Sequence, residues 1–240
     1  MPSSVRIDEL TMRLQRIADR YPAAALASSF GAEDMVLTDM IARHALPIAI
    51  FSLDTGRLHD ETYALIDRVR EHYGLPVELY YPDPRELEAY VRSQGVNAFY
   101  RSVELRQRCC AIRKSAPLAR ALAGRDAWIT GQRREQSITR RDLELEEYDA
   151  AHELPKFNPL VDWNEDDVWG YVRAHGVPTN PLHARGFPSI GCAPCTRAIE
   201  PGEDVRAGRW WWEQPEHKEC GLHRRPVHVP IREVRSEATP

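Results

Sequence analysis

A chain of 240 residues, 42% of them hydrophobic, can bury one full core and does not require two independent domains. Its net charge of −4 argues against a nucleic-acid partner, and no apolar run approaches the roughly 20 residues of a membrane-spanning helix. The start, MPSSVRIDEL, lacks the pattern of a secretion signal, so we expect a cytoplasmic protein with reduced cysteines and no membrane contact.

Helices and strands are predicted to alternate through the first 130 residues. The predicted order is a helix over 7–21, a strand over 24–28, a helix to about 44, a strand over 48–53, a helix over 60–73, a strand over 77–81, a helix after Pro84, a helix over 110–123 and a strand over 127–130. This alternation predicts an α/β fold, in which helices cover both faces of a parallel sheet.

The pattern becomes less regular after about residue 142. A helix is still predicted in NEDDVWGYVRAHG, where Asn164 can cap the N-terminus. From Gly176 onward proline, glycine, arginine and tryptophan become frequent, which predicts an irregular C-terminal segment laid across one rim of the sheet.

Three polar turns, SFGAED, LDTG and TGQRREQS, each follow a predicted strand. The carboxyl ends of parallel strands share one edge, so we expect these turns to form one rim. Gly31 precedes a helix N-terminus, which suits phosphate or a nucleotide, although many such turns bind nothing. Asp54 and Thr55 can close an Asx-turn or contact a ribose or base, and the sequence does not choose.

Four of the five cysteines form two couples, Cys109–Cys110 and Cys192-x-x-Cys195. The second couple has a chelating spacing. Adjacent cysteines fit different corners of a polynuclear cluster more easily than one compact ion. Four thiolates suit zinc or an iron–sulfur cluster, and the spacing leans toward iron without excluding zinc or buried free thiols.

Several cations accompany these motifs, and each could also be a solvated surface charge. Arg113 and Lys114 follow the first cysteine couple by one helical turn, so a cation can reach the same neighbourhood. Other arginines could bind phosphate or sulfate oxygens: Arg133, Arg134, Arg140, Arg206 and Arg209. The tryptophans at 210–212 favour a packing role over a docking surface.

The fifth cysteine, Cys220, stands alone in HKECGLH. His217, Lys218 and His223 are cations or potential cations that lower a thiol pKa, so a nucleophile is favoured. A second metal site with a neighbouring histidine and an inert tail thiol are the alternatives.

The motifs SSFGAEDMV, LDTGRL, CCAIRK, TGQRREQSITR, GCAPCTRAI, PGEDVRAGRWWWE and KECGLH together resemble the thioredoxin-dependent assimilatory adenylyl-sulfate (APS) reductases of the PAPS/APS reductase family. The resemblance spans nearly the whole chain. Relatives that reduce 3′-phosphoadenylyl sulfate (PAPS) lack the two cysteine couples, so their presence favours APS. The chain departs from the family by continuing past ECGLH through RRPVHVPIREVRSEATP.

The resemblance implies an adenine nucleotide α-hydrolase-like fold and one 4Fe–4S cluster per chain. It implies a nucleotide- and cluster-binding domain over 1–205 and a C-terminal segment over 206–240 with Cys220 as the catalytic residue. The implied cluster ligands are Cys109, Cys110, Cys192 and Cys195. The implied adenosine contacts are Ser28, Ser29, Phe30, Gly31, Ala32, Glu33, Asp34, Leu53, Asp54, Thr55 and Gly56. The implied phosphosulfate contacts are Lys114, Arg133, Arg134, Arg140, Arg206 and Arg209.

The expected reaction is attack of the Cys220 thiolate on the sulfur of APS, with AMP as the leaving group. A thioredoxin or glutaredoxin-type thiol would then release sulfite from the S-sulfocysteine. The alternatives are a PAPS or dual-specificity reductase, an iron–sulfur enzyme of the tRNA-thiolation type, and a zinc-binding module. Whether copies of the chain associate is left open.

Overall fold

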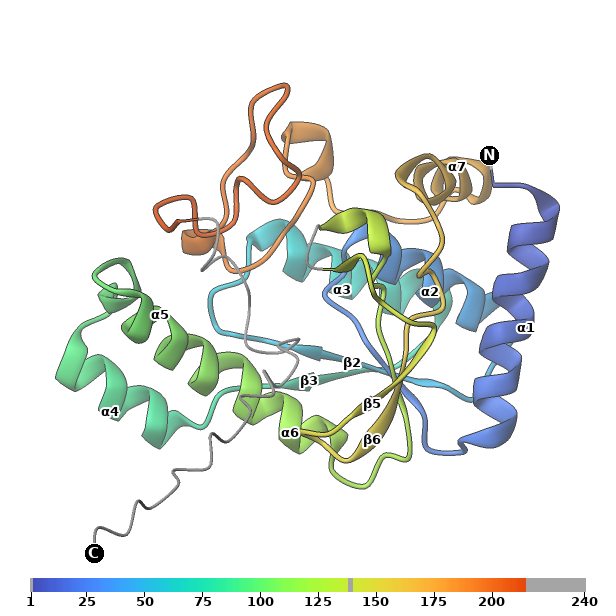
Figure 1. The fold of residues 1–240 in the computed structure, drawn as a ribbon. Helices are drawn as coiled ribbons and strands as arrows, with labels where there is room; N and C mark the ends of the chain where they lie inside the picture. Colours follow the sequence, from blue (N-terminus) through green and yellow to red (C-terminus); the bar gives the residue numbers. More distant parts are fainter. Residues whose placement is uncertain (1, 138–139, 215–240) are drawn as a thin grey trace, which may run out of the picture.

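A computed structural model describes residues 2–137 and 140–214. A six-stranded sheet lies at its centre in the order β3-β2-β1-β4-β6-β5 (Figure 1). The first five strands of that order are parallel, and only the edge strand β5 runs antiparallel to its neighbour. The strands are β1 (Ala25–Ala27), β2 (Ala49–Leu53), β3 (Val77–Tyr80), β4 (Trp128–Ile129), β5 (Glu146–Asp149) and β6 (Leu154–Phe157). The expected α/β class is confirmed.

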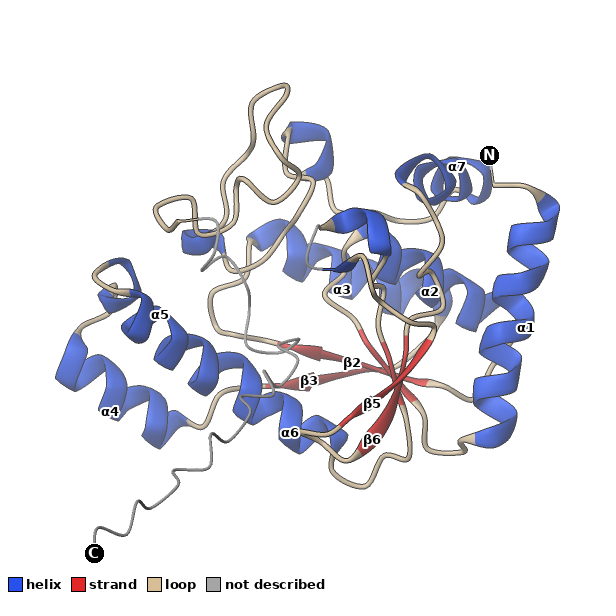
Figure 2. Cartoon of the chain, viewed as in Figure 1, coloured by secondary structure: helices blue, strands red, loops and turns tan. Residues whose placement is uncertain are grey.

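Helices cover both faces of this sheet (Figure 2). They are α1 (Ser4–Arg20), α2 (Ala32–Arg43), α3 (Asp60–Tyr73), α4 (Pro84–Gln94), α5 (Val103–Cys110), α6 (Ala116–Leu122) and α7 (Glu165–His175). In β1, the buried Leu26 packs in one cluster with residues of α1, α2, α3 and α7. Its neighbour Ala25 packs on the other face with Leu118 and Leu122 of α6. Successive strand residues therefore serve two different cores, as the alternation of side chains along a strand requires.

Local capping interactions fix the ends of several helices. The side chain of Asn164 accepts from the backbone N–H of Asp167, and the Asp167 carboxylate accepts from the backbone N–H of Asn164. This capping box confirms the predicted start of α7. The same helix ends at Gly176, whose φ of 62° is a left-handed conformation that glycine adopts without strain.

Two regions differ from the sequence-based expectation. The helix predicted over 110–123 begins earlier, at Val103, where the Ser102 side chain accepts from the backbone N–H of Leu105. A π-helical turn, Ala111–Ser115, then joins α5 to α6. The hairpin of β5 and β6 was not predicted, because β5 is the acidic run EEYD on an edge and carries no apolar alternation.

The chain from residue 176 to 214 is largely irregular, as expected for its described part. It contains two short 3₁₀ turns, His183–Arg185 and Ala193–Cys195, and an isolated bridge between Thr196 and Arg209. In Figure 1 its orange loops lie beyond the ends of the central strands, on the same side as the turns that follow β1, β2 and β4. Within the described residues, none of the helices combines the length and apolarity needed to cross a membrane.

Candidate active site: two adjoining cavities

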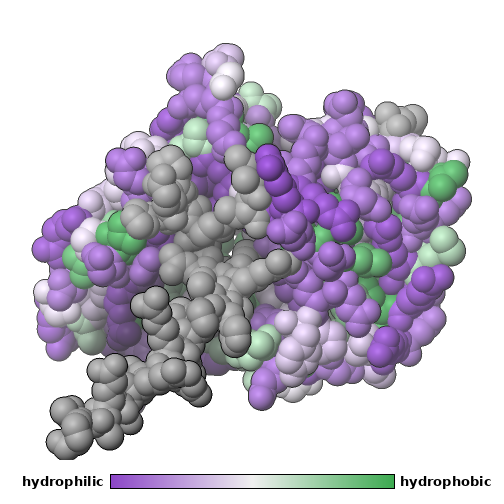
Figure 3. Space-filling view, viewed as in Figure 1, coloured by the Kyte–Doolittle hydropathy of each residue, from purple (hydrophilic) through white to green (hydrophobic). Residues whose placement is uncertain are grey.

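A cavity of about 760 Å³ opens at the carboxyl ends of the strands. Its walls come from the turns after β1, β2 and β4, together with 186–192 and 205–210 of the irregular segment. The three polar turns therefore share one rim, as predicted. The volume lies within the range of small-molecule sites and suits a nucleotide. The face seen in Figure 3 is mostly hydrophilic around the grey atoms, with scattered apolar patches.

The first turn is held by the carboxylate of Asp34. Asp34 Oδ2 accepts from the backbone N–H of Ser29 at 2.6 Å and from the Ser29 hydroxyl at 2.7 Å. Burial of Asp34 raises its pKa to about 6, although the bonds from Ser29 act in the opposite direction. Phe30, which follows Ser29 in this turn, has a φ of 59°. Its side chain is buried in the core and does not line the cavity.

Arg133 is bound to protein groups on several sides. Its Nε and Nη2 atoms both donate to Glu33 Oε1, at 2.9 and 2.8 Å, and its Nη1 donates to Glu135 and to the carbonyl of Trp163. These contacts fasten the turn after β4 to the first turn of α2. Arg133 lines the cavity, and the shorter of its two ion pairs is the one to Glu33, at 2.8 Å.

The turn after β2 is an Asx-turn closed by Asp54. Asp54 Oδ1 accepts from the backbone N–H of Gly56 and from the hydroxyl of Tyr63, both at 2.8 Å. Burial, followed by the bond to Asp54, raises the pKa of Tyr63 to about 12. Asp54 thereby positions its neighbour Thr55, which does line the cavity.

Most of the residues expected to contact substrate are brought to this cavity. Those that line it are Ser28, Ser29, Gly31, Ala32, Glu33, Asp34, Leu53, Thr55, Lys114, Arg133, Arg140, Arg206 and Arg209. Phe30, Asp54, Gly56 and Arg134 lie behind or outside the lining. Arg134 points to the carbonyl of Leu143 and lies 3.9 Å from the Glu144 carboxylate.

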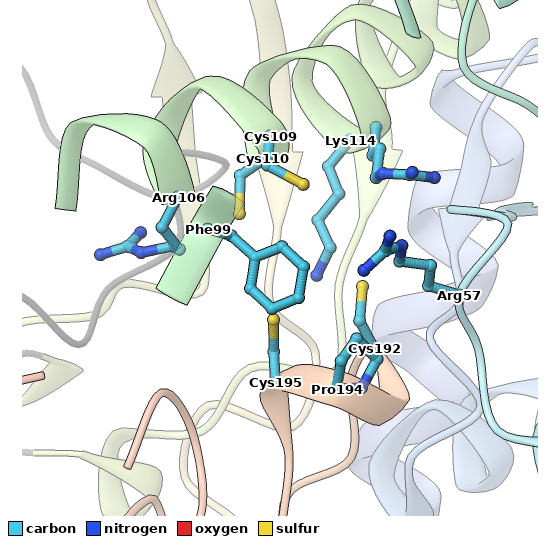
Figure 4. Close-up of a pocket in the computed structure, with 10 residues that line it drawn as sticks. Arg57, Phe99, Arg106, Cys109, Cys110, Lys114, Cys192, Pro194 and Cys195 are labelled. Atoms are coloured by element: carbon cyan, nitrogen blue, oxygen red, sulfur yellow. The ribbon is translucent and has the colours of Figure 1, made fainter. Parts of the chain in front are cut away.

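A second, smaller cavity is lined by both cysteine couples (Figure 4). Cys109 and Cys110 come from the end of α5, and Cys192 and Cys195 come from the facing turn. None of these four thiols is in a disulfide. The two couples are thus brought together from positions more than 80 residues apart in the sequence.

The cysteine cavity is cationic apart from its thiols. Among the residues that the structure describes, no carboxylate lines this cavity, whereas four cations do: Arg57, Arg106, Arg113 and Lys114. Burial, followed by the neighbouring Cys192, raises the pKa of Cys195 to about 12, and burial also raises the pKa of Cys109. Thiols in this setting ionise when further positive charge offsets the burial.

Among the described residues, no three His, Cys, Asp or Glu side chains converge closely enough to hold one metal ion. A single tetrahedral ion binds sulfur at about 2.3 Å and so draws four thiolates close together. A polynuclear cluster binds each thiolate at a different iron, so its ligands stand further apart. Four thiols that line one cavity are a ligand set that either kind of metal group uses.

The two cavities adjoin each other. Lys114 and Cys192 line both of them. Cys192 Sγ donates to Thr55 Oγ1 at 3.3 Å, which links the cysteine couple to the turn after β2. The wall between the cavities consequently carries one ammonium group and one thiol.

Sequence reasoning missed several residues in these walls. Arg57 follows LDTG directly, and its guanidinium carbon lies 5.0 Å from the ring centroid of Phe99, beside the cysteines. Arg106 lies three residues before Cys109, but its role depends on a partner 107 residues away in the sequence. Trp169 and His183 line the nucleotide-sized cavity without any sequence motif to mark them.

The tryptophans at 210–212 pack mainly within the protein, as the sequence favoured. Trp210 is 1% exposed, and the Trp212 ring lies 4.5 Å from that of Tyr100, whereas Trp211 is 39% exposed. The expected nucleophile, Cys220, lies outside the described residues.

A sequence model of the phosphoadenosine phosphosulfate reductase domain matches residues 23–198. The chain belongs to this family. A curated Burkholderia cepacia relative named adenosine 5′-phosphosulfate reductase is 58% identical over 92% of this chain and 88% of its own length. Relatives of the same name from Allochromatium vinosum (58%, over 88% of this chain and 83% of the relative) and Neisseria meningitidis (54%, over 91% and 90%) are also similar.

Solved structures agree with this placement. A phosphoadenylyl-sulfate (PAPS) reductase from Candida auris, in a phosphate complex, has a TM-score of 0.68 at 25% identity and covers 79% of this chain and 90% of its own. An FMN adenylyltransferase from Candida glabrata has a TM-score of 0.55 at 14% identity, over 89% of this chain and 76% of its own, and supports the fold alone. The expected family and nucleotide-binding fold are confirmed.

Proposed function

We propose that this chain reduces APS to sulfite and AMP in sulfate assimilation. The observation that carries the proposal is the shared wall of the two cavities, where Lys114 and Cys192 face both the nucleotide-sized space and the four cysteines. Relatives about half to three-fifths identical over most of their length carry the name adenosine 5′-phosphosulfate reductase, which supports APS as the substrate.

The adenosine of APS would lie in the large cavity against the turns after β1 and β2. Exposed backbone N–H groups at the start of α2 suit a polar ligand. The phosphosulfate would extend toward Lys114, which lines both cavities, and toward Arg206 and Arg209, which line the large one. Arg133 would act on the nucleotide indirectly, because Glu33 already holds its guanidinium.

In the first step the thiolate of Cys220 would attack the sulfur of APS. The bond from sulfur to the bridging oxygen breaks, AMP leaves with that oxygen and its electron pair, and Cys220 becomes an S-sulfocysteine. Lys114 would offset the negative charge that builds on the leaving oxygen. A preorganised donor of this kind is worth about 3–4 kcal/mol.

In the second step a reduced dithiol protein, of the thioredoxin or glutaredoxin type, would attack the sulfur atom of Cys220. Sulfite leaves and a mixed disulfide forms, which the second thiol of the partner resolves. The dithiol is oxidised, and the two electrons reduce the sulfonate sulfur to sulfite. We propose that the segment 206–240, whose described part packs on the domain over 1–205, presents Cys220 first to the nucleotide and then to another protein.

We propose that Cys109, Cys110, Cys192 and Cys195 hold one 4Fe–4S cluster. Three observations on the described residues support a cluster in this cavity: its four thiols are free, four cations line it, and no carboxylate lines it. When bound, such a cluster supplies a covalent link between α5 and the turn at 192–195 and a fixed charge beside Lys114. The surrounding arginines would stabilise the thiolates whether or not substrate is present.

The direct test is an assay of sulfite release from APS and from PAPS with a reduced thioredoxin. The proposal expects rapid release from APS, slower release from PAPS and none from Cys220→Ser. Equal or faster turnover of PAPS would favour the dual-specificity or PAPS alternative. Iron and sulfide analysis of protein purified without oxygen tests the cluster separately, and zinc in place of iron would contradict it.

A further inference from the structure

A buried ion pair stands where the described chain ends. Arg106, on α5, and Glu213 lie 107 positions apart in the sequence. Arg106 Nε donates to Glu213 Oε1 at 2.9 Å, and Arg106 Nη2 donates to Glu213 Oε2 at 2.6 Å. The two side chains are 1% and 3% exposed. A two-pronged contact of this kind fixes the orientation of both groups.

Trp210 completes the arrangement. The guanidinium carbon of Arg106 lies 4.7 Å from the centroid of the Trp210 ring. The backbone N–H of Trp210 donates to the carbonyl of Cys195 at 3.1 Å, and that of Glu213 donates to the carbonyl of Trp210 at 2.8 Å. The turn from 210 to 213 is therefore tied to α5 and to the second cysteine couple.

This buried ion pair is expected to add little to the net free energy of unfolding. The cost of removing two charges from water offsets much of their attraction, and a well-packed apolar pair often does as well. A buried pair gives one defined geometry, however, and loss of one partner leaves a buried charge uncompensated.

We propose that Arg106 and Glu213 form a clamp that fixes the point from which the chain leads to Cys220. Cys220 comes seven positions after Glu213, so the chain length alone keeps it within at most about 25 Å of an anchored Glu213. Arg106 and Glu213 are positioning residues, and their effect on the reaction rests on the function proposed above.

The clamp also couples the cysteine cavity to the reactive segment. Arg106 lies one helical turn before Cys109 and Cys110, and it lines the same cavity. Trp210 is bonded to Cys195. The contacts that hold the segment leading to Cys220 therefore lie directly beside the two cysteine couples.

Glu213→Gln tests the clamp, because an amide presents an N–H group where Arg106 requires a second acceptor. Arg106→Lys is the second variant, since lysine retains the charge but cannot form the two-pronged contact. Glu78→Gln is the matched control: Glu78 also accepts twice from an arginine, Arg125, but its side chain is 40% exposed and lies on β3. All proteins are full-length and purified with their metal content measured.

Two measurements are made on each protein. Amide hydrogen exchange over 209–214 reports whether the turn is held. Single-turnover release of AMP from APS, without reductant, reports the first chemical step. We expect both clamp variants to exchange faster over 209–214 and to release AMP about tenfold more slowly, because a less restricted segment lowers the effective concentration of the thiol. AMP affinity should stay within about twofold of the unaltered chain.

Unchanged exchange in Glu213→Gln would overturn the clamp. Faster exchange with an unchanged rate of AMP release would overturn the positioning role of the clamp. That role would also be overturned if the variants lost AMP affinity and bound iron in proportion to their loss of rate. The Glu78→Gln control should match the unaltered chain in every measurement. If the unaltered chain released no AMP from APS, the proposed function would fail, whereas hydrogen exchange would still decide whether the clamp exists.

Discussion

Gly131 lies directly against Asp34. A Cβ atom added at Gly131 would come within 2.3 Å of Asp34 Oδ1 and 3.1 Å of the Asp34 backbone nitrogen. The turn after β4 and the first turn of α2 thus approach more closely than a side chain at 131 permits. Both turns line the large cavity, so this approach sets the shape of the expected nucleotide site.

Gly131→Ala is expected to weaken AMP binding about tenfold or more, because the added methyl group separates the two turns. Isothermal titration calorimetry with AMP measures this loss. Gly74→Ala is the control: Gly74 has a φ of 65° at the end of α3, and a Cβ there meets nothing within 4 Å. It should lower stability by about 1 kcal/mol and leave AMP affinity unchanged. Equal affinities of the two variants would contradict the role of Gly131.

The raised pKa of Asp34 predicts a pH-dependent stability. Burial raises this pKa from 3.8 to about 6. The contribution of Asp34 to the free energy of unfolding is therefore fully present below about pH 3.8 and is lost as the pH rises through about 6. The total change corresponds to about 3 kcal/mol, since one pKa unit is about 1.4 kcal/mol.

Asp34→Asn removes this titration while keeping the shape of the side chain. Urea unfolding at pH 5 and pH 7 gives the difference in free energy of unfolding between the variant and the unaltered chain. We expect that difference to shift in favour of the variant as the pH rises, because only the unaltered chain then acquires a buried charge. A difference that does not change with pH would show that Asp34 has an ordinary pKa.

Lys114 is expected to act on chemistry more than on binding. Lys114→Met should slow single-turnover AMP release from APS by about 10² to 10³, because it removes the ammonium group from the wall between the cavities. AMP affinity should change much less. Arg16→Ala, an exposed position on α1, is the control. A similar loss in AMP affinity and rate would indicate a general binding role instead.

Asp39 is expected to be a stability residue remote from the reaction. Its buried carboxylate accepts from Tyr73 at 2.9 Å, from Tyr171 at 2.7 Å and from Arg43 at 2.6 Å, joining α2 to α3 and α7. Asp39→Ala should lower the free energy of unfolding by about 3–5 kcal/mol, because three donors lose their acceptor. Urea denaturation measures this, and a loss below about 1 kcal/mol would contradict it.

The sequence predicted the parts of this protein that depend on local pattern. The alternation of strands and helices to residue 130, the Asn164 cap and the shared rim of three turns follow from periodicity, capping chemistry and the geometry of parallel strands. The edge strand β5 escaped prediction because three of its four residues are acidic and it carries no alternation of apolar side chains.

The contacts across long sequence separations were beyond local pattern. Nothing in GQRREQS indicates that Arg133 pairs with Glu33, and nothing near Arg106 indicates that its partner is Glu213. Phe30 and Asp54 were expected to contact substrate, but they stabilise the turns and do not line the cavity. A short motif specifies a backbone conformation as well as the side chains that face a ligand.

The most direct test is mass spectrometry of the full-length protein mixed with APS in the absence of any reductant. We expect one added sulfonate group per chain, located on Cys220 by peptide mapping, with release of one equivalent of AMP. Addition of reduced thioredoxin should remove the group and yield sulfite. The absence of an adduct at Cys220, or an equal adduct in Cys220→Ser, would contradict the account.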